Sequence, residues 1–371
     1  MAGGLCPYAL GVRAGVLVTS LAMSEGIATP TTARLLELID GMAGQPVVML
    51  VDLVADRFIT GSPKRISREA PVLILSYEQE ILTPGGGGNA VANIAGLGGK
   101  PLPLGIVGQD RSGRRLLEAL QNLGVDTGGI VEREGFRTPT KTRILSGARH
   151  SIKQQIVRYD IEDQLEPSAS DLAQFRTKLG EWAGRARVAV VSDYGYGAVR
   201  PELLPEIRQS LVDGGQILGD SRHHLADLEG LDGASPNEEE AEALLGRPIT
   251  DDNQELLTAG TEILAQLSAA FLLITRGSYG MCLFDGSNVC RIPVHGTDQV
   301  ADVTGAGDTV IGTFAMALAA GATPLEASLL ANYAGGIVVM KVGTAIVNRA
   351  ELEEAVKTDT RPLEELEWAR S

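Results

Sequence analysis

The pattern of apolar and polar positions predicts an α/β fold with a mostly parallel sheet. Apolar runs of strand length alternate with segments in which apolar residues recur at helical spacing. The expected strands are 47–51, 102–107, 188–192, 216–219 and 271–275, and the clearest expected helices are 31–42, 113–123 and 201–212. Alternation of this kind is typical of a parallel sheet covered by helices. Ligands bind such sheets at the carboxyl ends of the strands, so the polar residues after each run are candidates for a functional site.

A second pattern interrupts this alternation. Residues 70–82, 140–146 and 154–159 have the composition of strands but do not fit the strand–helix order around them. We therefore expect a small β-sheet lid, formed by about residues 57–83 and 138–160. A lid that excludes water suits phosphoryl transfer, because hydrolysis is the competing reaction. The open edges of such a sheet need cover, which favours a homodimer formed through the lid.

The stretch Val300–Phe314 carries the most specific candidate chemistry. Asp302 is followed by small residues at 304–307, then by Asp308 and an apolar run. Small residues let the backbone approach a ligand, and if a helix begins here, its first amides and its dipole form an anion site. Asp308 then suits a base that takes a proton from a nucleophile attacking a phosphoryl group. The residues alone leave a second interpretation open, in which Asp308 only stabilises the helix N-terminus.

Further polar residues follow other expected strands. Asp52 and Asp56 come after the first apolar run, where two carboxylates are suited to hydrogen-bond sugar hydroxyls, with a solvated loop as the alternative. The glycine run 84–88 leads through Asn89 into an apolar helix, which again favours close approach of the backbone to a ligand. No Walker motif and no G-x-G-x-x-G motif occurs in the chain. Arg276 follows a strand, where it could reach a phosphate or cap the sheet edge.

A helix is expected to begin after Asn237, with Glu240 three residues further on. A capping box would explain this pair by itself. A carboxylate at this place is also suited to hold Mg²⁺ directly or through water, because Mg²⁺ keeps much of its hydration. A second helix start is expected at Thr323, with Pro324 at its first position.

These motifs resemble those of the ribokinase-like (PfkB) sugar kinases. D-x-T-G-A-G-D at 302–308 is similar to the C-terminal signature of that family, and N-x-x-E at 237–240 to a motif near its metal and triphosphate. The resemblance implies a three-layer α/β/α domain with a small β-sheet lid, ATP as co-substrate and Mg²⁺. The catalytic residues that it implies are Asp308, Gly305, Ala306 and Gly307. It implies metal contacts by Glu240 and Asp302, and nucleotide binding by Asn237, Glu238, Glu239, Glu240, Arg222, Thr275, Arg276, Gly277, Thr304 and Asn332.

One branch of the family is more similar than the rest. Motifs at 52–58, 65–72, 140–144, 158–160, 192–194 and 302–312 resemble the kinase domain of the heptose 7-phosphate kinases of lipopolysaccharide assembly, over roughly residues 35–355. This resemblance implies transfer of the ATP γ-phosphate to the anomeric hydroxyl of D-glycero-β-D-manno-heptose 7-phosphate. The implied substrate-binding residues are Asp52, Asp56, Arg57, Gly85, Gly86, Asn89, Lys141, Arg143 and Arg158, and Lys64 and Arg65 are further candidates for the sugar's phosphate.

The chain departs from that branch at several positions. Val51 stands where the branch has Gly, Tyr196 where it has Lys, and Asp220-Ser221-Arg222 where it has D-P-K. These departures leave a kinase for another sugar, sugar phosphate or nucleoside as one alternative. A non-catalytic sugar-binding regulator that kept the fold is the other. Nothing after Thr344 resembles the adenylyltransferase half of some members, so adenylyl transfer is not expected.

Composition restricts the partners and the compartment. The net charge of −15 argues against nucleic acid as a general partner, since phosphate backbones need a basic surface. No apolar run reaches the ~18 residues of a membrane span. Three cysteines give neither a disulfide framework nor a metal-binding spacing, so reduced thiols and a cytoplasmic location are expected. Residues 1–30 are expected to be a poorly ordered extension, 31–358 the kinase domain and 359–371 a tail.

Overall fold

The computed structural model describes residues 29–147, 153–249, 252–286, 288–296 and 301–370, so the N-terminal stretch up to residue 28 and the loop around Arg149 lie outside the described residues. Within the described part, ten strands form one sheet in the order β14-β13-β12-β11-β10-β9-β8-β1-β4-β5. Its strands are β1 (Pro46–Val51), β4 (Lys100–Gly108), β5 (Ile130–Arg133), β8 (Val188–Asp193), β9 (Gln216–Ser221), β10 (Gly233–Ala234), β11 (Phe271–Thr275), β12 (Met281–Asp285), β13 (Asn288–Ile292) and β14 (Glu367–Arg370).

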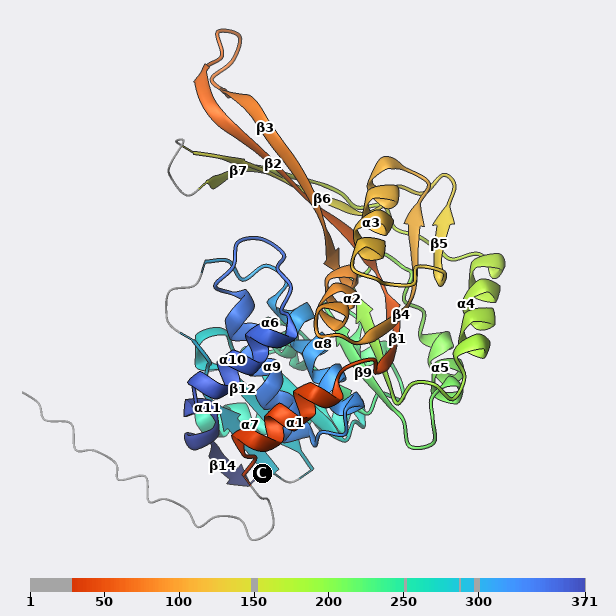
Figure 1. Ribbon diagram of the computed structural model, residues 1–371, viewed down its shortest axis with the longest axis vertical. Coiled ribbons are helices and arrows are strands. Elements are labelled where there is room, and N and C mark those ends of the chain that lie inside the picture. The colour runs from red at the N-terminus through yellow and green to blue at the C-terminus, as the bar shows by residue number, and fades with distance from the viewer. Residues whose placement is uncertain (1–28, 148–152, 250–251, 287, 297–300, 371) are drawn as a thin grey trace, which may run out of the picture.

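Helices cover both faces of this sheet (Figure 1). They are α1 (Thr32–Gly41), α2 (Gly87–Gly96), α3 (Arg111–Asn122), α4 (Ala169–Trp182), α5 (Leu204–Ser210), α6 (Glu238–Leu245), α7 (Asn253–Leu267), α8 (Ala306–Ala319), α9 (Pro324–Val338), α10 (Arg349–Thr358) and α11 (Arg361–Glu364), with short 3-10 turns at Pro201–Leu203, Leu225–Asp227 and Gly277–Tyr279.

Strand β1 shows why the core has two halves. Its side chains alternate between the faces, as a strand requires. Val47, Met49 and Val51 pack with α1, α2, α8 and α9 on one face, whereas Val48 and Leu50 pack with α4, α5 and α7 on the other. A strand buried on both faces is apolar at every position, which is the signal that the sequence carries at 47–51.

The central strands pair in parallel, as expected. β1 lies between β4 and β8, and the parallel pairing continues through β9 and β10 to β11. The ladder then turns antiparallel through β12 and β13 to β14. The fold is therefore a mixed α/β fold with a large, mostly parallel sheet, and the expected fold class is confirmed.

Four further strands form the smaller sheet, which we call the lid. Its order is β3-β2-β6-β7, from β2 (Leu53–Ile66), β3 (Leu73–Gly86), β6 (Thr140–Ser146) and β7 (Gln154–Ile161). Figure 1 shows the lid projecting from the body, with its long β2–β3 hairpin reaching furthest. Strand β2 was not among the expected strands, because only its first three residues continue the apolar run and the rest alternate irregularly with polar residues.

The tail expected at 359–371 contains regular structure up to residue 370. The described chain continues through α11 to β14, which pairs with β13 at the edge of the large sheet. Trp368 packs against the hydrophobic core. A single large apolar side chain, Trp368, is too weak a signal to predict a strand from the sequence. The strand forms because the edge of β13 offers hydrogen-bonding partners. Among the described residues, no helix is both long and apolar enough to cross a membrane.

Candidate active site

Asp308 lies in the first turn of α8, and only 2% of its surface is exposed. Gly305 precedes the helix with a φ of 77°, a left-handed conformation that an L side chain adopts only under strain. A Cβ added at Gly305 would also collide with the side-chain amide of Asn89. Glycine is therefore required where the loop turns into the helix and Asn89 packs against it.

Two side chains from distant parts of the chain hold the Asp308 carboxylate. The Tyr194 hydroxyl donates to Asp308 Oδ1 at 2.8 Å, and Asn89 Nδ2 donates to Asp308 Oδ2 at 3.3 Å. Burial raises the pKa of Asp308 to about 7, and the hydrogen bonds from Tyr194 and Asn89 oppose this rise. A carboxyl group that titrates near neutral pH is well matched to accept a proton during a reaction.

The loop before α8 presents backbone N–H groups beside Asp308. The Ala306 N–H donates to the Val303 carbonyl oxygen at 3.2 Å. Within the described part of the chain, no acceptor takes the N–H of Gly305 or of Gly307, and neither glycine is buried. Unpaired amides at the start of a 14-residue helix attract an anion. Of the three amides expected to bind an anion, two are available and that of Ala306 is engaged in the turn.

Asp52 is buried at the end of β1, and both of its oxygens are engaged within the protein. The N–H groups of Tyr194 and Tyr196 donate to Oδ2 at 3.0 and 2.9 Å, and that of Ala198 donates to Oδ1 at 2.9 Å. Burial raises the pKa of Asp52 to about 6, against the effect of these hydrogen bonds. Asp52 thus fixes the loop after β8, which carries Tyr194.

Asp56 lies four residues after Asp52, inside strand β2, and is 3% exposed. Arg143 on the neighbouring strand β6 donates to Asp56 Oδ1 at 2.5 Å. On the other side, a Cβ at Gly85 would collide with the Asp56 carboxylate, so the glycine leaves the space that this carboxylate occupies. The negative charge of Asp56 also raises the pKa of Asp308, which shows that the two carboxylates share one electrostatic environment.

The basic residues of the lid separate into paired and unpaired groups. Arg57 donates to Glu80 at 2.8 Å, and Arg158 to Asp160 on its own strand. Lys64 and Arg65 are exposed near the end of β2. Lys141 is different: it is 8% exposed and forms no ion pair with any residue that the structure describes. Burial lowers the pKa of Lys141, and the positive charge of Arg222 adds to this effect.

A cavity of about 420 Å³ lies between the lid and the ends of β8 and β9. Its lining includes Lys141, Arg158, Tyr194, Tyr196, Arg222 and His223. Lys141 Nζ lies 5.2 Å and Arg222 Cζ 5.0 Å from the centre of the Tyr194 ring. Tyr194 lines this cavity and its hydroxyl bonds Asp308, so one side chain links the cavity to the buried carboxylate.

The residues expected on the nucleotide side lie at the ends of β9, β10 and β11. Asn237 caps α6 and forms the capping box with Glu240, with both hydrogen bonds at 2.9 Å. Glu238 accepts a hydrogen bond from Arg276 at 2.8 Å, while Glu239 is exposed. Thr275 ends β11 and Gly277 opens a 3-10 turn. The N-terminal side of α6 is thereby tied to the turn after β11.

Carboxylates suited to a hard cation gather nearby. Burial raises the pKa of Asp220 at the end of β9, and the negative charges of Glu240 and Asp308 raise it further. Burial also raises the pKa of Glu240. Within the described residues, no group of three or more His, Cys, Asp or Glu side chains is arranged to hold a metal alone. Asp220 and Glu240 therefore fit Mg²⁺ that is held mainly by phosphates and water.

Asp302 holds the loop that leads to Asp308. Its oxygens accept hydrogen bonds from the N–H of Thr304 at 2.9 Å and from that of Gly343 at 3.0 Å. Burial alone would raise the pKa of Asp302, but these hydrogen bonds keep it below its usual range. Both oxygens have protein donors, so Asp302 ties the loop to the chain after α9.

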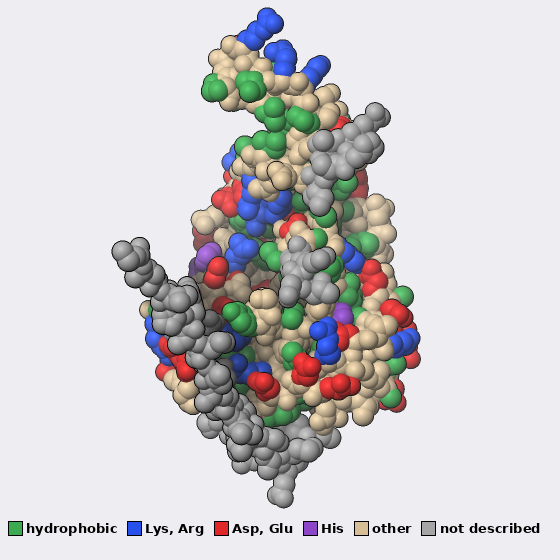
Figure 2. Space-filling view, turned by 90° about the vertical axis from the view of Figure 1, so that its left-hand side faces the viewer, with side chains coloured by type: hydrophobic (Ala, Val, Ile, Leu, Met, Phe, Trp, Pro, Cys, Tyr) green, Lys and Arg blue, Asp and Glu red, His purple; other side chains and the backbone are tan. Residues whose placement is uncertain are grey.

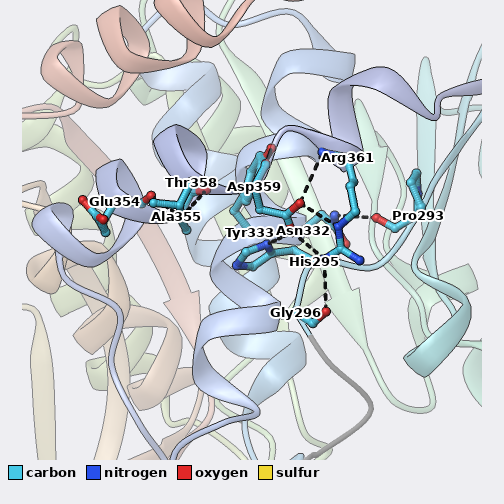
Figure 3. A network of polar contacts seen from close by, with 10 residues as sticks. All are labelled: Pro293, His295, Gly296, Asn332, Tyr333, Glu354, Ala355, Thr358, Asp359 and Arg361. Atoms are coloured by element: carbon cyan, nitrogen blue, oxygen red, sulfur yellow. Dashed lines mark hydrogen bonds and ion pairs between the residues drawn. The ribbon is translucent and has the colours of Figure 1, made fainter.

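A polar network joins the middle of α9, the start of α11 and the chain after β13 (Figure 3). His295 Nδ1 lies 2.8 Å from Asp359 Oδ2, and Arg361 donates to the same carboxylate. The Tyr333 hydroxyl donates to the Asp359 carbonyl oxygen at 2.6 Å. Asn332, expected to bind nucleotide, is 2% exposed and donates to the Pro293 carbonyl oxygen at 2.9 Å.

The sequence profile described as "pfkB family carbohydrate kinase" matches residues 48–351, which include most of β1, the lid, Asp308 and the start of α10. The chain belongs to the pfkB family of carbohydrate kinases. The resemblance of the signature at 302–308 is thereby confirmed at the level of the whole domain.

Curated relatives of this pfkB-family protein carry the name "Bifunctional protein HldE". The protein from Mesorhizobium japonicum is 35% identical over 337 residues, covering 88% of this chain and 65% of that protein. That from Magnetococcus marinus is 39% identical and covers 84% and 64%. That from Pseudomonas aeruginosa is 37% identical and covers 85% and 64%. The chain thus spans slightly less than two thirds of the length of these relatives.

Solved structures support the fold of the pfkB-family protein. Phosphofructokinase-2 from Escherichia coli in complex with substrates and products superposes with a TM-score of 0.68 at 19% identity, covering 84% of this chain and 98% of that one. Ribokinase from Arabidopsis thaliana complexed with ribose and ATP gives 0.66 at 21% identity, with coverage of 85% and 100%. At such identities the likeness concerns the fold, and it confirms the expected ribokinase-like architecture.

Two residues of this pfkB-family site were not among the candidates from the sequence. Tyr194 follows the strand-end residues Ser192 and Asp193, and Asp220 is the last residue but one of β9. Each stands at the carboxyl end of a parallel strand, which was the available signal. What could not be seen is that the loop after β8 folds back over Asp52 and brings a phenol to Asp308.

Proposed function

We propose that this protein is an ATP-dependent kinase that phosphorylates the anomeric hydroxyl of a phosphorylated heptose, converting D-glycero-β-D-manno-heptose 7-phosphate into the 1,7-bisphosphate. The observation that carries the proposal is the geometry at the start of α8. A buried carboxyl group that titrates near neutral pH lies beside unpaired helix amides, in a member of a carbohydrate kinase family.

Asp308 acts as the base in this proposal. Its carboxylate takes the proton of the sugar hydroxyl as the hydroxyl oxygen attacks the γ-phosphorus. The bond between that oxygen and phosphorus forms, the bond from phosphorus to the bridging oxygen breaks, and ADP leaves with the electron pair. The N–H groups of Gly305 and Gly307 bind the charge on the migrating group, as an anion hole formed in advance. Ala306 contributes mainly by holding the turn.

The sugar would lie between the lid and α2. Asp56, Asn89 and the backbone at Gly85 and Gly86 would offer acceptors and donors for its hydroxyls. Asn89 bonds Asp308, the charge of Asp56 acts on Asp308, and Gly85 lies against Asp56. Asp52, expected in the same role, supports this site through the loop that it holds. The basic cavity suits the phosphate that the sugar already carries, since neither Lys141 nor Arg222 forms an ion pair among the described residues, and Glu162 is the carboxylate that lines the same cavity. Arg57 and Arg158 have carboxylate partners.

The nucleotide would lie on the other side of Asp308, over the ends of β9 and β11. Mg²⁺ would neutralise the phosphate charge there. Asp220 and Glu240 are the residues that would hold it through water. Arg276, Thr275, Gly277 and Thr304 border the same side. Because ATP is the co-substrate, a cytoplasmic location is part of the proposal.

A homodimer through the lid completes the proposal. Large apolar side chains are exposed on lid strands, among them Tyr77, Ile81, Ile156 and Tyr159, and Figure 2 shows hydrophobic side chains gathered on the lid with Lys and Arg at its far end. Exposed apolar patches and open sheet edges favour association.

The function is tested with the purified chain, ATP, Mg²⁺ and a set of sugars. The set contains the heptose 7-phosphate, the unphosphorylated heptose, a phosphorylated hexose, ribose and a nucleoside. ADP release is expected to be fastest with the heptose 7-phosphate.

Tyr196 stands where the similar kinases have Lys, and its hydroxyl bonds Glu162 at 3.3 Å. That change favours a different sugar phosphate as the second candidate, and faster turnover of the phosphorylated hexose would select it. If no sugar stimulates ADP release, the protein is not a sugar kinase.

Asp308→Asn tests the base. The change keeps the size and the hydrogen-bonding ability of the side chain but removes its basicity. We expect kcat to fall by about 10²–10⁴-fold, with little change in the binding of either substrate, because general base catalysis contributes on that order. Steady-state kinetics and calorimetric titration with ADP measure the two quantities. Near-normal turnover of this variant would remove Asp308 from the mechanism.

A further inference from the structure

We propose that Tyr194 is a positioning residue for Asp308: its hydroxyl holds the base in one orientation and keeps it ionised until the acceptor hydroxyl arrives. This inference rests on the proposed role of Asp308. It assigns a task to a side chain that the signature at 302–308 does not contain, and that reaches the site from another strand.

The geometry makes Tyr194 the donor. Its hydroxyl lies 2.8 Å from Asp308 Oδ1. This hydrogen bond is shorter than the one from Asn89 Nδ2 to Asp308 Oδ2, which is 3.3 Å long. Burial and the negative charge of Asp308 raise the pKa of Tyr194 well above its usual range, so the phenol keeps its proton. A phenol that stays protonated can only donate to a carboxylate, and donation favours the ionised form.

Tyr194 is itself held on several sides. Its N–H donates to the Asp52 carboxylate at 3.0 Å, which fixes the backbone of the loop. Lys141 and Arg222 lie against its ring at 5.2 and 5.0 Å. Two cations beside an aromatic ring fix its plane and strengthen its hydroxyl as a donor. A phenol fixed in this way can hold the carboxylate in one rotamer, which lowers the reorganisation needed in the reaction.

The groups around Asp308 determine the direction of the effect. Asn89 on α2 donates to it, Asp56 on β2 and Asp220 at the end of β9 repel its charge, and Arg222 after β9 attracts it. Burial raises the pKa of Asp308 to about 7, and the Tyr194 hydroxyl opposes that rise. Removing this hydroxyl therefore raises the pKa of Asp308 further, so that less of the base is ionised at neutral pH.

The primary test is a direct titration that needs no sugar. The protein is labelled with ¹³C at the aspartate carboxyl carbons, and Asp308→Asn identifies the Asp308 signal. In Tyr194→Phe we expect the midpoint of that signal to move upward by about one pH unit, roughly tenfold in proton affinity, which is typical of one lost hydrogen bond to a charged group. An unchanged or lowered midpoint overturns the proposal.

Tyr196→Phe is the matched control. Tyr196 lies two residues away and lines the same cavity, but its hydroxyl bonds Glu162 rather than Asp308. Its loss should leave the Asp308 midpoint where it is. If both variants move the midpoint equally, the effect comes from the cavity in general and not from the Tyr194 hydroxyl. Thermal unfolding and ADP binding show whether each variant is folded.

Kinetics provide the second readout. With the sugar that is turned over best, the acid limb of the kcat/KM profile should move to higher pH in Tyr194→Phe, and kcat should fall several-fold with KM for ATP unchanged. In an Asp308→Asn background the same change should have little further effect, because Tyr194 acts through Asp308. An additive loss in the double variant overturns the proposal. If Asp308→Asn itself keeps its turnover, it is the proposed role of Asp308 as the base that fails, and the titration still shows whether Tyr194 controls the ionisation of Asp308.

Discussion

At the scale of single residues, the site depends on a carboxylate whose properties come from its neighbours. An aspartate in water is fully ionised at neutral pH. Burial under α2 and the loop after β8 brings Asp308 close to half ionisation, and the donors Asn89 and Tyr194 limit that change. The same enclosure requires Gly305, because the loop must turn sharply against Asn89.

Gly305 and Gly307 form a matched pair for a stability experiment. Gly305→Ala places a side chain at a φ of 77° and against Asn89. We expect it to lower the free energy of unfolding by about 1–3 kcal/mol, because the left-handed conformation and the collision both cost energy. A Cβ at Gly307 meets nothing within 4 Å, and alanine is the better helix former.

Thermal unfolding of the two variants measures the difference. Gly307→Ala should unfold at the wild-type temperature or slightly above it. A Gly305→Ala variant as stable as the wild type would mean that the loop before α8 can adopt another conformation.

At the scale of elements, the carboxyl ends of β8, β9 and β11 and the starts of α2, α6 and α8 meet around Asp308. This is the edge at which parallel α/β sheets bind ligands. Each helix start is fixed differently: α8 by a left-handed glycine, α2 by Gly86 with a φ of 54°, and α6 by a capping box. A capping residue can stabilise its helix and can also contribute to a ligand site. Comparing two caps of the same kind, only one of which lies at this edge of the sheet, distinguishes the two roles.

Asn237 and Asn348 both close capping boxes, with the partners Glu240 and Glu351. Asn237→Ala and Asn348→Ala should each lower stability by about 1 kcal/mol, through loss of the cap. If the start of α6 also adjoins the nucleotide, only Asn237→Ala should raise KM for Mg–ATP.

Urea unfolding and initial rates at varied ATP measure the two effects. Equal KM values for the two cap variants would make the Asn237–Glu240 pair purely structural.

At the scale of the whole molecule, the body built on the large sheet carries the proposed phosphoryl-transfer groups, and the projecting lid carries part of the proposed sugar site (Figure 1). Asp56 and Arg143 lie on lid strands, whereas Asp308 lies on a helix of the body. The proposed site is therefore formed by the lid and the body together. The lid also exposes apolar side chains that a monomer would leave in water.

Tyr77 and Tyr279 test the lid dimer. Tyr77 on β3 is 67% exposed, and Tyr279, which lies outside the lid in the turn after β11, is 63% exposed. Tyr77→Asp should shift the molecular mass in light scattering from dimer to monomer, because a charge replaces an apolar contact, while Tyr279→Asp should leave the mass unchanged. A wild-type chain that is monomeric at micromolar concentration contradicts the lid dimer.

The sequence by itself determined the alternation of the central sheet, the lid strand 140–146, the capping box after Asn237 and the motif around Asp308. These features are local: apolar periodicity, cap residues and glycines act within a few residues of one another. That is why the family could be inferred from short motifs.

Only the tertiary structure decided how Asp308 is held and which charges remain available. Tyr194 and Asn89 approach it from 114 and 219 residues away. Arg222 shares a cavity with Lys141, Asp52 supports a loop, and β14 completes the sheet edge. Hydrogen bonds, burial and ion pairs of this kind depend on contacts between distant segments, and no local pattern in the chain records them.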